Sequence, residues 1–156
     1  MAIQLKKVSN IETLALGFNY EGSIDIASDV PTGGAVDIQF NSAELIGTVG
    51  KAALVVDQHV PADNSGSTDY TSYKVQVGDT ADPNGQIADV ELCPAGTEAA
   101  LGTIFTNTGD DAFGTAVTNV GATFVSLNET DEALATAGKV RVFFEYYPTA
   151  GDNFSG

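Results

Sequence analysis

The chain has 156 residues and a formal net charge of −15, from 21 acidic and 6 basic residues. A single cysteine, Cys93, excludes an internal disulfide framework, and a single histidine, His59, excludes a histidine-rich metal site. An acidic chain is repelled by phosphate backbones and anionic lipid, and six scattered cations form no basic patch. Nucleic acid and membranes are therefore not expected as partners.

The length is typical of one domain, and no long linker or internal repeat divides the sequence. We expect a single domain over residues 1–156, with residues 1–10 as an N-terminal arm and residues 148–156 as a flexible tail. No apolar stretch follows the first lysines, and the longest apolar run, 52–56, is far shorter than the ~20 residues of a membrane helix. We therefore expect no secretion signal and no membrane segment, and production in the cytoplasm.

Alternation of apolar and polar residues predicts β-strands along most of the chain. The alternating segments, in chain order, are 14–18, 20–26, 36–40, 73–77 and 139–147. Two more continuously apolar segments, 48–56 and 116–127, are expected to be inner or bulged strands, with Gly121 marking a bulge. Shorter candidates are 87–92 and 101–105. Together these segments predict eight or nine strands.

Turn-forming residues separate the predicted strands. They lie at 31–34, 63–66, 82–85 and 108–111. Helical turns are expected only at 94–101 and 129–137, the second with Asn128 as its cap and Gly138 as its end. Many short strands joined by such turns favour an all-β fold, an antiparallel β-sandwich or jelly roll, over an α/β fold.

The segment 79–85 places three oxygen-bearing side chains in one loop, which is a weak signal for calcium. These side chains are Asp79, Asp82 and Asn84. The segment lacks the regular spacing and the distal glutamate of an EF-hand, so we favour an Asx-type turn. No metal ligand and no cofactor are assigned to the chain.

Two further features are weak candidates for catalysis. Asp110 and Asp111 are paired carboxylates, but adjacent acids on a glycine-rich loop are usually solvated. Cys93 would need a neighbouring base, and His59 lies 34 positions upstream. We interpret Cys93 as a small buried or half-buried thiol, and no catalytic residue is assigned.

The last predicted strand has two aromatic residues on its outward side. If Val142 and Phe144 face the core, Phe143 and Tyr147 point away from it. This pattern predicts a surface that is covered, either by another chain or by the domain's own arm. Burial of both sheet faces, or a bulge that reorients the side chains, is the alternative. Phe113 and Phe154 are further candidate anchors, with ordinary core or tail positions as the alternative.

The order of features over residues 70–147, about half the chain, resembles that of a known family. Residues 73–79, Tyr-Lys-Val-Gln-Val-Gly-Asp, close a strand into an aspartate-rich turn, and a glycine-rich middle follows. The strand around 122–125 comes next, and the final strand contains Ala-Gly-Lys-Val-Arg-Val-Phe-Phe-Glu-Tyr-Tyr at 137–147. This order resembles the capsid decoration or cement proteins of tailed bacteriophages, which have jelly-roll folds.

The resemblance implies a non-enzymatic structural protein of the virion. Such a protein would form a homotrimer on the capsid exterior, bind the major capsid protein and clamp neighbouring capsomers, without catalytic residues. Lys6 and Lys7 would then form the cationic end of an acidic molecule that contacts the shell. The candidate interface residues are Lys6, Lys7, Phe113, Phe143, Tyr147 and Phe154. Residues 29–70 do not match the family pattern, so the contact face stays open.

Three other functions are compatible with a β-sandwich of this size. A head-fibre or tail component is the alternative within virions. A carbohydrate-binding module would usually stack sugars on exposed aromatic residues, and the absence of tryptophan weighs against it. A cupin-type enzyme would need a cluster of histidines for its metal, which one histidine does not provide.

Overall fold

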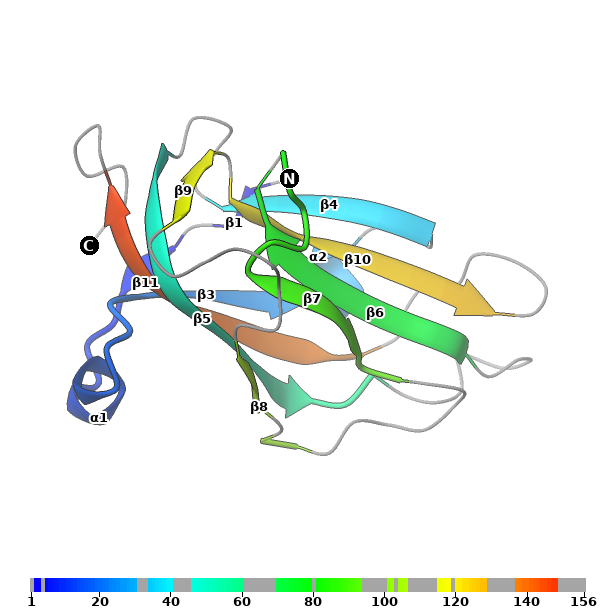
Figure 1. Cartoon of the computed structure of the whole chain (residues 1–156). Helices are drawn as coiled ribbons and strands as arrows, with labels where there is room; N and C mark the ends of the chain where they lie inside the picture. Colours follow the sequence, from blue (N-terminus) through cyan, green and yellow to red (C-terminus); the bar gives the residue numbers. More distant parts are fainter. Residues whose placement is uncertain are drawn as a thin grey trace.

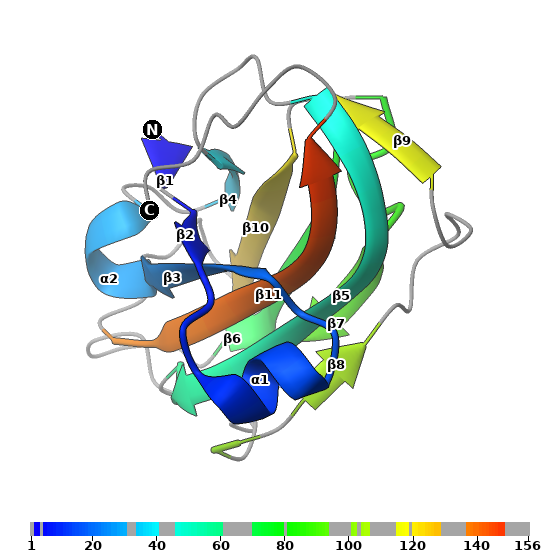
Figure 2. The same ribbon diagram turned by 90° about the vertical axis from the view of Figure 1, so that its left-hand side faces the viewer.

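The computed structural model describes most of the chain and contains two β-sheets that pack as two layers (Figures 1 and 2). The described residues are 2–3, 5–30, 34–40, 46–60, 70–79, 81–93, 101–102, 104–106, 115–118, 120–128 and 137–148. Within them, neither helix has the length or the apolar character needed to cross a bilayer.

The first sheet, here the A sheet, has the strand order β1-β4-β10-β6-β7. Its strands are β1 (Ala2–Ile3), β4 (Gly34–Phe40), β10 (Gly121–Asn128), β6 (Tyr70–Gly78) and β7 (Ile87–Glu91). The central strand β10 pairs antiparallel with both β4 and β6, while the short β1 pairs parallel with β4.

The second sheet, here the B sheet, has the order β2-β3-β11-β5-β8, and β9 also pairs with β5. Its strands are β2 (Lys6–Lys7), β3 (Tyr20–Asp25), β11 (Lys139–Pro148), β5 (Ile46–Gln58), β8 (Ile104–Thr106) and β9 (Thr115–Thr118). All its pairs are antiparallel, and the longest contact joins β11 to β5.

The connections between the sheets define a jelly roll. Apart from the two-residue strands β1 and β2, the A sheet reads β4-β10-β6-β7, and the B sheet reads β3-β11-β5 with β8 and β9 beyond it. Strands distant in sequence are therefore neighbours in each sheet, as in two interlocked Greek keys. Among the described residues nine strands remain when the two shortest are set aside, which confirms the predicted all-β antiparallel sandwich.

The main core lies between the two sheets and is built from the side chains that point inward, which are every second residue along a strand. On β11 these residues are Val140, Val142, Phe144 and Tyr146, which face the core as the alternation predicts. Phe144 packs edge-on against Phe40 across the sandwich, with ring centroids 5.6 Å apart. Burial, with a smaller contribution from Tyr20, raises the pKa of the Tyr146 phenol above its ordinary value.

The predicted strand over 14–18 is wrong, because this part of the chain begins with helix α1 (Ile11–Ala15). The Asn10 side chain accepts a hydrogen bond from the Thr13 amide at 3.0 Å and so caps the first turn. Gly17, with φ of 97°, follows the C-cap in the left-handed region that ends many helices. The alternation of Leu14, Leu16 and Phe18 therefore reflects a short capped helix and its exit.

Two other boundaries differ from the predicted segments. The segment 116–127 is divided into β9 and β10, and Gly121 is the first residue of β10 and not the site of a bulge within one strand. Residue 26 does not continue β3 but starts a second short helix, α2 (Ile26–Asp29), where the Asp29 carboxylate accepts a bond from the Asp25 amide. The predicted helical turns at 94–101 and 129–137 lie almost wholly outside the described residues.

Residues from the predicted N-terminal arm pack into the sandwich. β1 extends the A sheet beside β4, whereas β2 extends the B sheet beside β3. Between them Leu5 is buried in the main core, and its methyl group lies over Gly22. At the other end β11 finishes at Pro148, and residues 149–156 of the predicted tail lie outside the described residues.

Candidate interaction surface

The charged residues are distributed unequally between the two sheets. The B-sheet strands contain five basic and four acidic residues, a net charge of +1 in a chain of −15. The A-sheet strands contain one basic and three acidic residues, and the other fourteen acidic residues lie outside the described strands. The B-sheet residues are Lys6, Lys7, Glu21, Asp25, Lys51, Asp57, Lys139, Arg141 and Glu145. Of the two sheets, the B sheet therefore repels a second acidic molecule less.

A second, smaller apolar group covers the outer side of the B sheet; we call it the outer cluster. It contains Val8, Ala53 and Phe143, with Phe18 and Val55 packed against them. The Phe18 and Phe143 rings are 6.0 Å apart, and the Arg141 guanidinium lies 5.2 Å from the Phe143 ring centroid. Phe143 is therefore outward-facing but only 6% exposed.

The sequence predicted that Phe143 is covered either by another chain or by the domain's own arm, and its burial within the single chain decides between the two. The chain's own residues Val8 and Phe18 cover its ring, so the N-terminal part of the same domain closes this position. Phe143 is consequently not available as an anchor for another chain, and its place among the candidate interface residues is corrected. The alternation placed the side chain on the outer face but could not show what lies above that face.

The segment from Val8 to Asn19 connects β2 to β3 of the B sheet, and we call it the 8–19 loop. The Val8 amide donates to the Asn19 carbonyl at 2.9 Å and closes its base. The Asn19 side chain donates to the Tyr146 carbonyl at 3.0 Å and accepts from the Tyr146 amide at 2.9 Å. Lys51 Nζ donates to the Leu16 carbonyl at 2.6 Å. These four hydrogen bonds hold the loop in a defined place beside β5 and β11 (Figure 2).

The outermost part of the loop is apolar and exposed. Ile11 is 81% exposed, Leu16 65% and Leu14 44%, and helix α1 has no buried residue. We call these three side chains the apolar tip. Leu101 and Ile104 are also exposed, and Ile104 lies opposite Val55 on β5 of the same sheet. The signal that could have revealed the loop is the Asn10 cap followed by Gly17.

The other predicted interface residues are distributed as follows. Lys6 and Lys7 are exposed on β2, where Lys6 lies opposite Glu21. Tyr147 is 54% exposed near the end of β11, opposite Thr48. Phe113 and Phe154 lie outside the described residues. The structure thus brings Lys6 and Lys7 to the same sheet as the apolar tip.

Ion pairs join neighbouring strands on the outer face of the B sheet. Arg141 binds Asp57 through two hydrogen bonds of 2.6 and 3.0 Å, and this interaction raises the pKa of its guanidinium. Lys139 Nζ lies 3.9 Å from an oxygen of Asp25. These partly exposed pairs link β11 to β5 and to β3 and contribute little stability individually.

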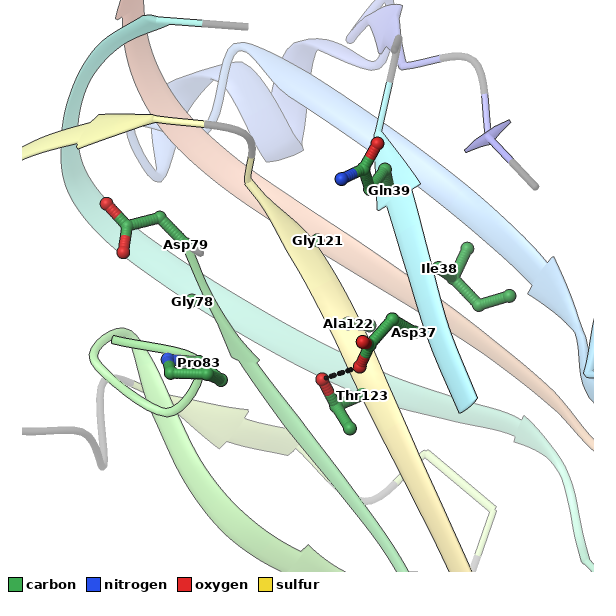
Figure 3. Close-up of a pocket in the computed structure, with 9 residues that line it drawn as sticks. All are labelled: Asp37, Ile38, Gln39, Gly78, Asp79, Pro83, Gly121, Ala122 and Thr123. Carbon is green, nitrogen blue, oxygen red and sulfur yellow. Dashed lines mark hydrogen bonds between the residues drawn. The ribbon is translucent and has the colours of Figure 1, made fainter. Parts of the chain in front are cut away.

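The outer face of the A sheet has a shallow depression of about 150 Å³ (Figure 3). Asp37, Asp79 and Pro83 border it, and the Thr123 hydroxyl donates to Asp37 at 2.8 Å. Its other lining residues are Ile38, Gln39, Gly78, Gly121 and Ala122. The lining combines acidic and polar side chains with small apolar residues, without an aromatic side chain.

The weak calcium signal at 79–85 corresponds to a turn. Asp79 Oδ1 accepts hydrogen bonds from the amides of Ala81 at 2.9 Å and Asp82 at 2.7 Å, which is an Asx-type arrangement. Among the described residues no group of three or more His, Cys, Asp or Glu side chains is placed to hold a metal ion. Cys93 is buried, and Asp110 and Asp111 lie outside the described residues.

The chain was compared with family models, with curated proteins and with solved structures, and none of them matches it. The interpretation of this surface therefore depends on its charge, exposure and geometry.

Proposed function

We propose that this chain is a non-enzymatic structural protein of a tailed-bacteriophage virion, a decoration or cement protein. In this role it binds the major capsid protein on the outside of the shell as a homotrimer and stabilises the shell. The observation that carries the proposal is the apolar tip, held in place on the sheet with a net charge of +1 in a chain of −15. An ordered apolar surface beside the less acidic sheet is typical of a face that docks on another protein chain, as assembly into a trimer requires.

The fold and the charge support the same role. Jelly rolls occur widely in viral coat proteins, although the fold by itself does not imply a function. Fourteen acidic residues outside the described strands favour solubility where many copies stand close together on one shell. A head-fibre or tail component would use the same features and stays the alternative within virions.

Binding to capsids is the direct test. Purified chain is mixed with empty heads assembled from the major capsid protein encoded in the same genome, and co-sedimentation and the melting temperature of the heads are measured. We expect saturable binding and a rise in the melting temperature. Heads that neither bind the chain nor gain stability at saturating concentration would contradict the proposed function.

One observation favours a second candidate, a carbohydrate-binding module. The depression on the A sheet is bordered by carboxylates, an amide and a hydroxyl, groups that bind sugar hydroxyls. A glycan array with wild-type chain and Asp37→Ala would test this candidate. Binding of one glycan class that Asp37→Ala abolishes would favour it over the capsid role.

A further inference from the structure

We propose that one copy of this chain binds the next head-to-tail, with the apolar tip of one copy seated against Leu101 and Ile104 of its neighbour. This inference rests on the proposed trimer and names its contact. The tip comprises Ile11, Leu14 and Leu16. Ile104 is 62% exposed and Leu101 58% exposed, so both surfaces are open in the single chain.

The tip is built to stay exposed. A flexible segment with three large apolar residues would turn them toward its own core, because burial removes apolar area from water. Here the base bond from Val8 to Asn19, the paired bonds between Asn19 and Tyr146, and the bond from Lys51 to Leu16 fix the loop on β5 and β11 and leave the tip side chains exposed. The remaining way to remove the tip from water is a contact with another molecule.

The distribution of charge favours this place for the binding of a second copy. Two chains of −15 repel each other wherever their acidic parts face one another. Both exposed apolar groups lie beside the B sheet, whose strands have a net charge of +1, and Glu12 is the one acidic residue of the 8–19 loop. Two copies that meet here therefore face fewer acidic residues than at the A sheet, whose strands have a net charge of −2. Self-association of this chain is therefore less opposed at the sheet that has apolar area to bury beside it.

Two separate apolar groups point to a head-to-tail arrangement. The loop contacts β5 at Lys51, whereas Ile104 lies opposite Val55, four residues farther along the same strand. Four residues of β-strand span about 13 Å, from a rise of about 3.3 Å per residue. A tip and a receiving surface at different positions form a heterologous contact, and such contacts close into rings when the rotation between copies allows it.

The test uses neutral substitutions at each surface. The tip variant is Leu14→Gln with Leu16→Gln, and the receiving variant is Leu101→Gln with Ile104→Gln. Ala15→Gln, at an exposed position of the same helix, is the matched control. Light scattering and sedimentation measure the mass over a range of concentrations, and circular dichroism checks that each variant is folded.

We expect wild type and Ala15→Gln to form trimers, and each double variant to dissociate at least about tenfold more readily, as for central residues of an interface. An equimolar mixture of the two double variants should form dimers, because the intact tip of one fits the intact receiving surface of the other. A monomeric wild type, unchanged assembly of either variant, or a mixture that stays monomeric would overturn the inference.

Failure of this inference and failure of the proposed function are distinguishable. Capsid binding is measured separately on the wild-type chain. A chain that binds heads but assembles normally after the tip substitutions keeps the capsid role and loses this contact. A chain that forms the predicted ring but does not bind heads keeps the contact and loses the capsid role.

Discussion

Phe143 and Phe144 are adjacent on β11 and buried, yet different parts of the molecule bury them. Phe144 faces the main core and packs on Phe40, so both sheets enclose it. Phe143 faces the opposite way and is covered by residues of the 8–19 loop. Side chains on the inner face of a sheet are buried because the other sheet packs against them. Side chains on the outer face are buried only where another segment of the chain crosses that face.

The difference between the two aromatic residues predicts the largest effect. Phe144→Ala should lower the free energy of unfolding by about 3–5 kcal/mol, because the rigid core cannot fill the cavity. Phe143→Ala should cost about half as much, because the loop above it can settle into the space. Urea denaturation of both variants measures the two values, and equal losses would show that the outer cluster is as rigid as the main core.

The attachment of the loop can be broken without touching either apolar group. Asn19→Ala removes both hydrogen bonds with the Tyr146 backbone and should cost about 1–3 kcal/mol. Hydrogen exchange at the Tyr146 amide should become faster at the same time. Asn10→Ala, which removes only the helix cap, is the control and should cost about 1 kcal/mol. Unchanged exchange in Asn19→Ala would contradict the role of this side chain.

Gly17, which follows the C-terminus of helix α1, tests how tightly the 8–19 loop is fixed. Its φ of 97° disfavours any other residue, and a Cβ there would meet Lys51 Nζ. Gly17→Ala should lower the free energy of unfolding by about 1–2 kcal/mol. Gly102→Ala is the matched control, since its φ is 74° and no atom lies within 4 Å of the added Cβ. Thermal unfolding that shows equal losses would mean that the Lys51 contact adds no cost.

The smallest effect is expected on the outer face of the B sheet. Asp57→Asn removes the ionic partner of Arg141 and should cost about 0.2–1 kcal/mol, as is usual for partly exposed pairs. The loss should shrink in high salt, because salt screens exposed charges. Asp25→Asn, whose oxygen is 3.9 Å from Lys139, should cost less still. A loss that does not depend on salt would assign the effect to packing of Arg141 on Phe143.

Much of the sandwich could be predicted from local alternation. β4, β6 and β11 match their predicted segments closely, because one face of each strand is buried and the side chains alternate with period two. α1 could not be predicted from the same rule, since Leu14, Leu16 and Phe18 also alternate. There the Asn10 cap and Gly17 determine a helix, and neither of them is an apolar signal.

The candidate surface was predicted only in part. Lys6, Lys7 and Tyr147 are exposed, as surface residues should be, but Phe143 is covered. Two of the three residues of the apolar tip, Leu14 and Leu16, were assigned to a strand. Exposure of the tip depends on bonds from Asn19 to Tyr146, 127 positions apart in the chain. Such long-range bonds leave no periodic pattern in the sequence.

The amino-acid sequence by itself determined an acidic, all-β chain and the face of β11 on which each residue lies, because charge and alternation are local properties. The tertiary structure decided that most of the basic residues meet on one sheet, that Phe143 is covered and that Ile11, Leu14 and Leu16 are not. These outcomes depend on which distant segments the jelly-roll connections bring together. Burial and net charge of a surface are sums over such neighbours, so they follow only from the assembled fold.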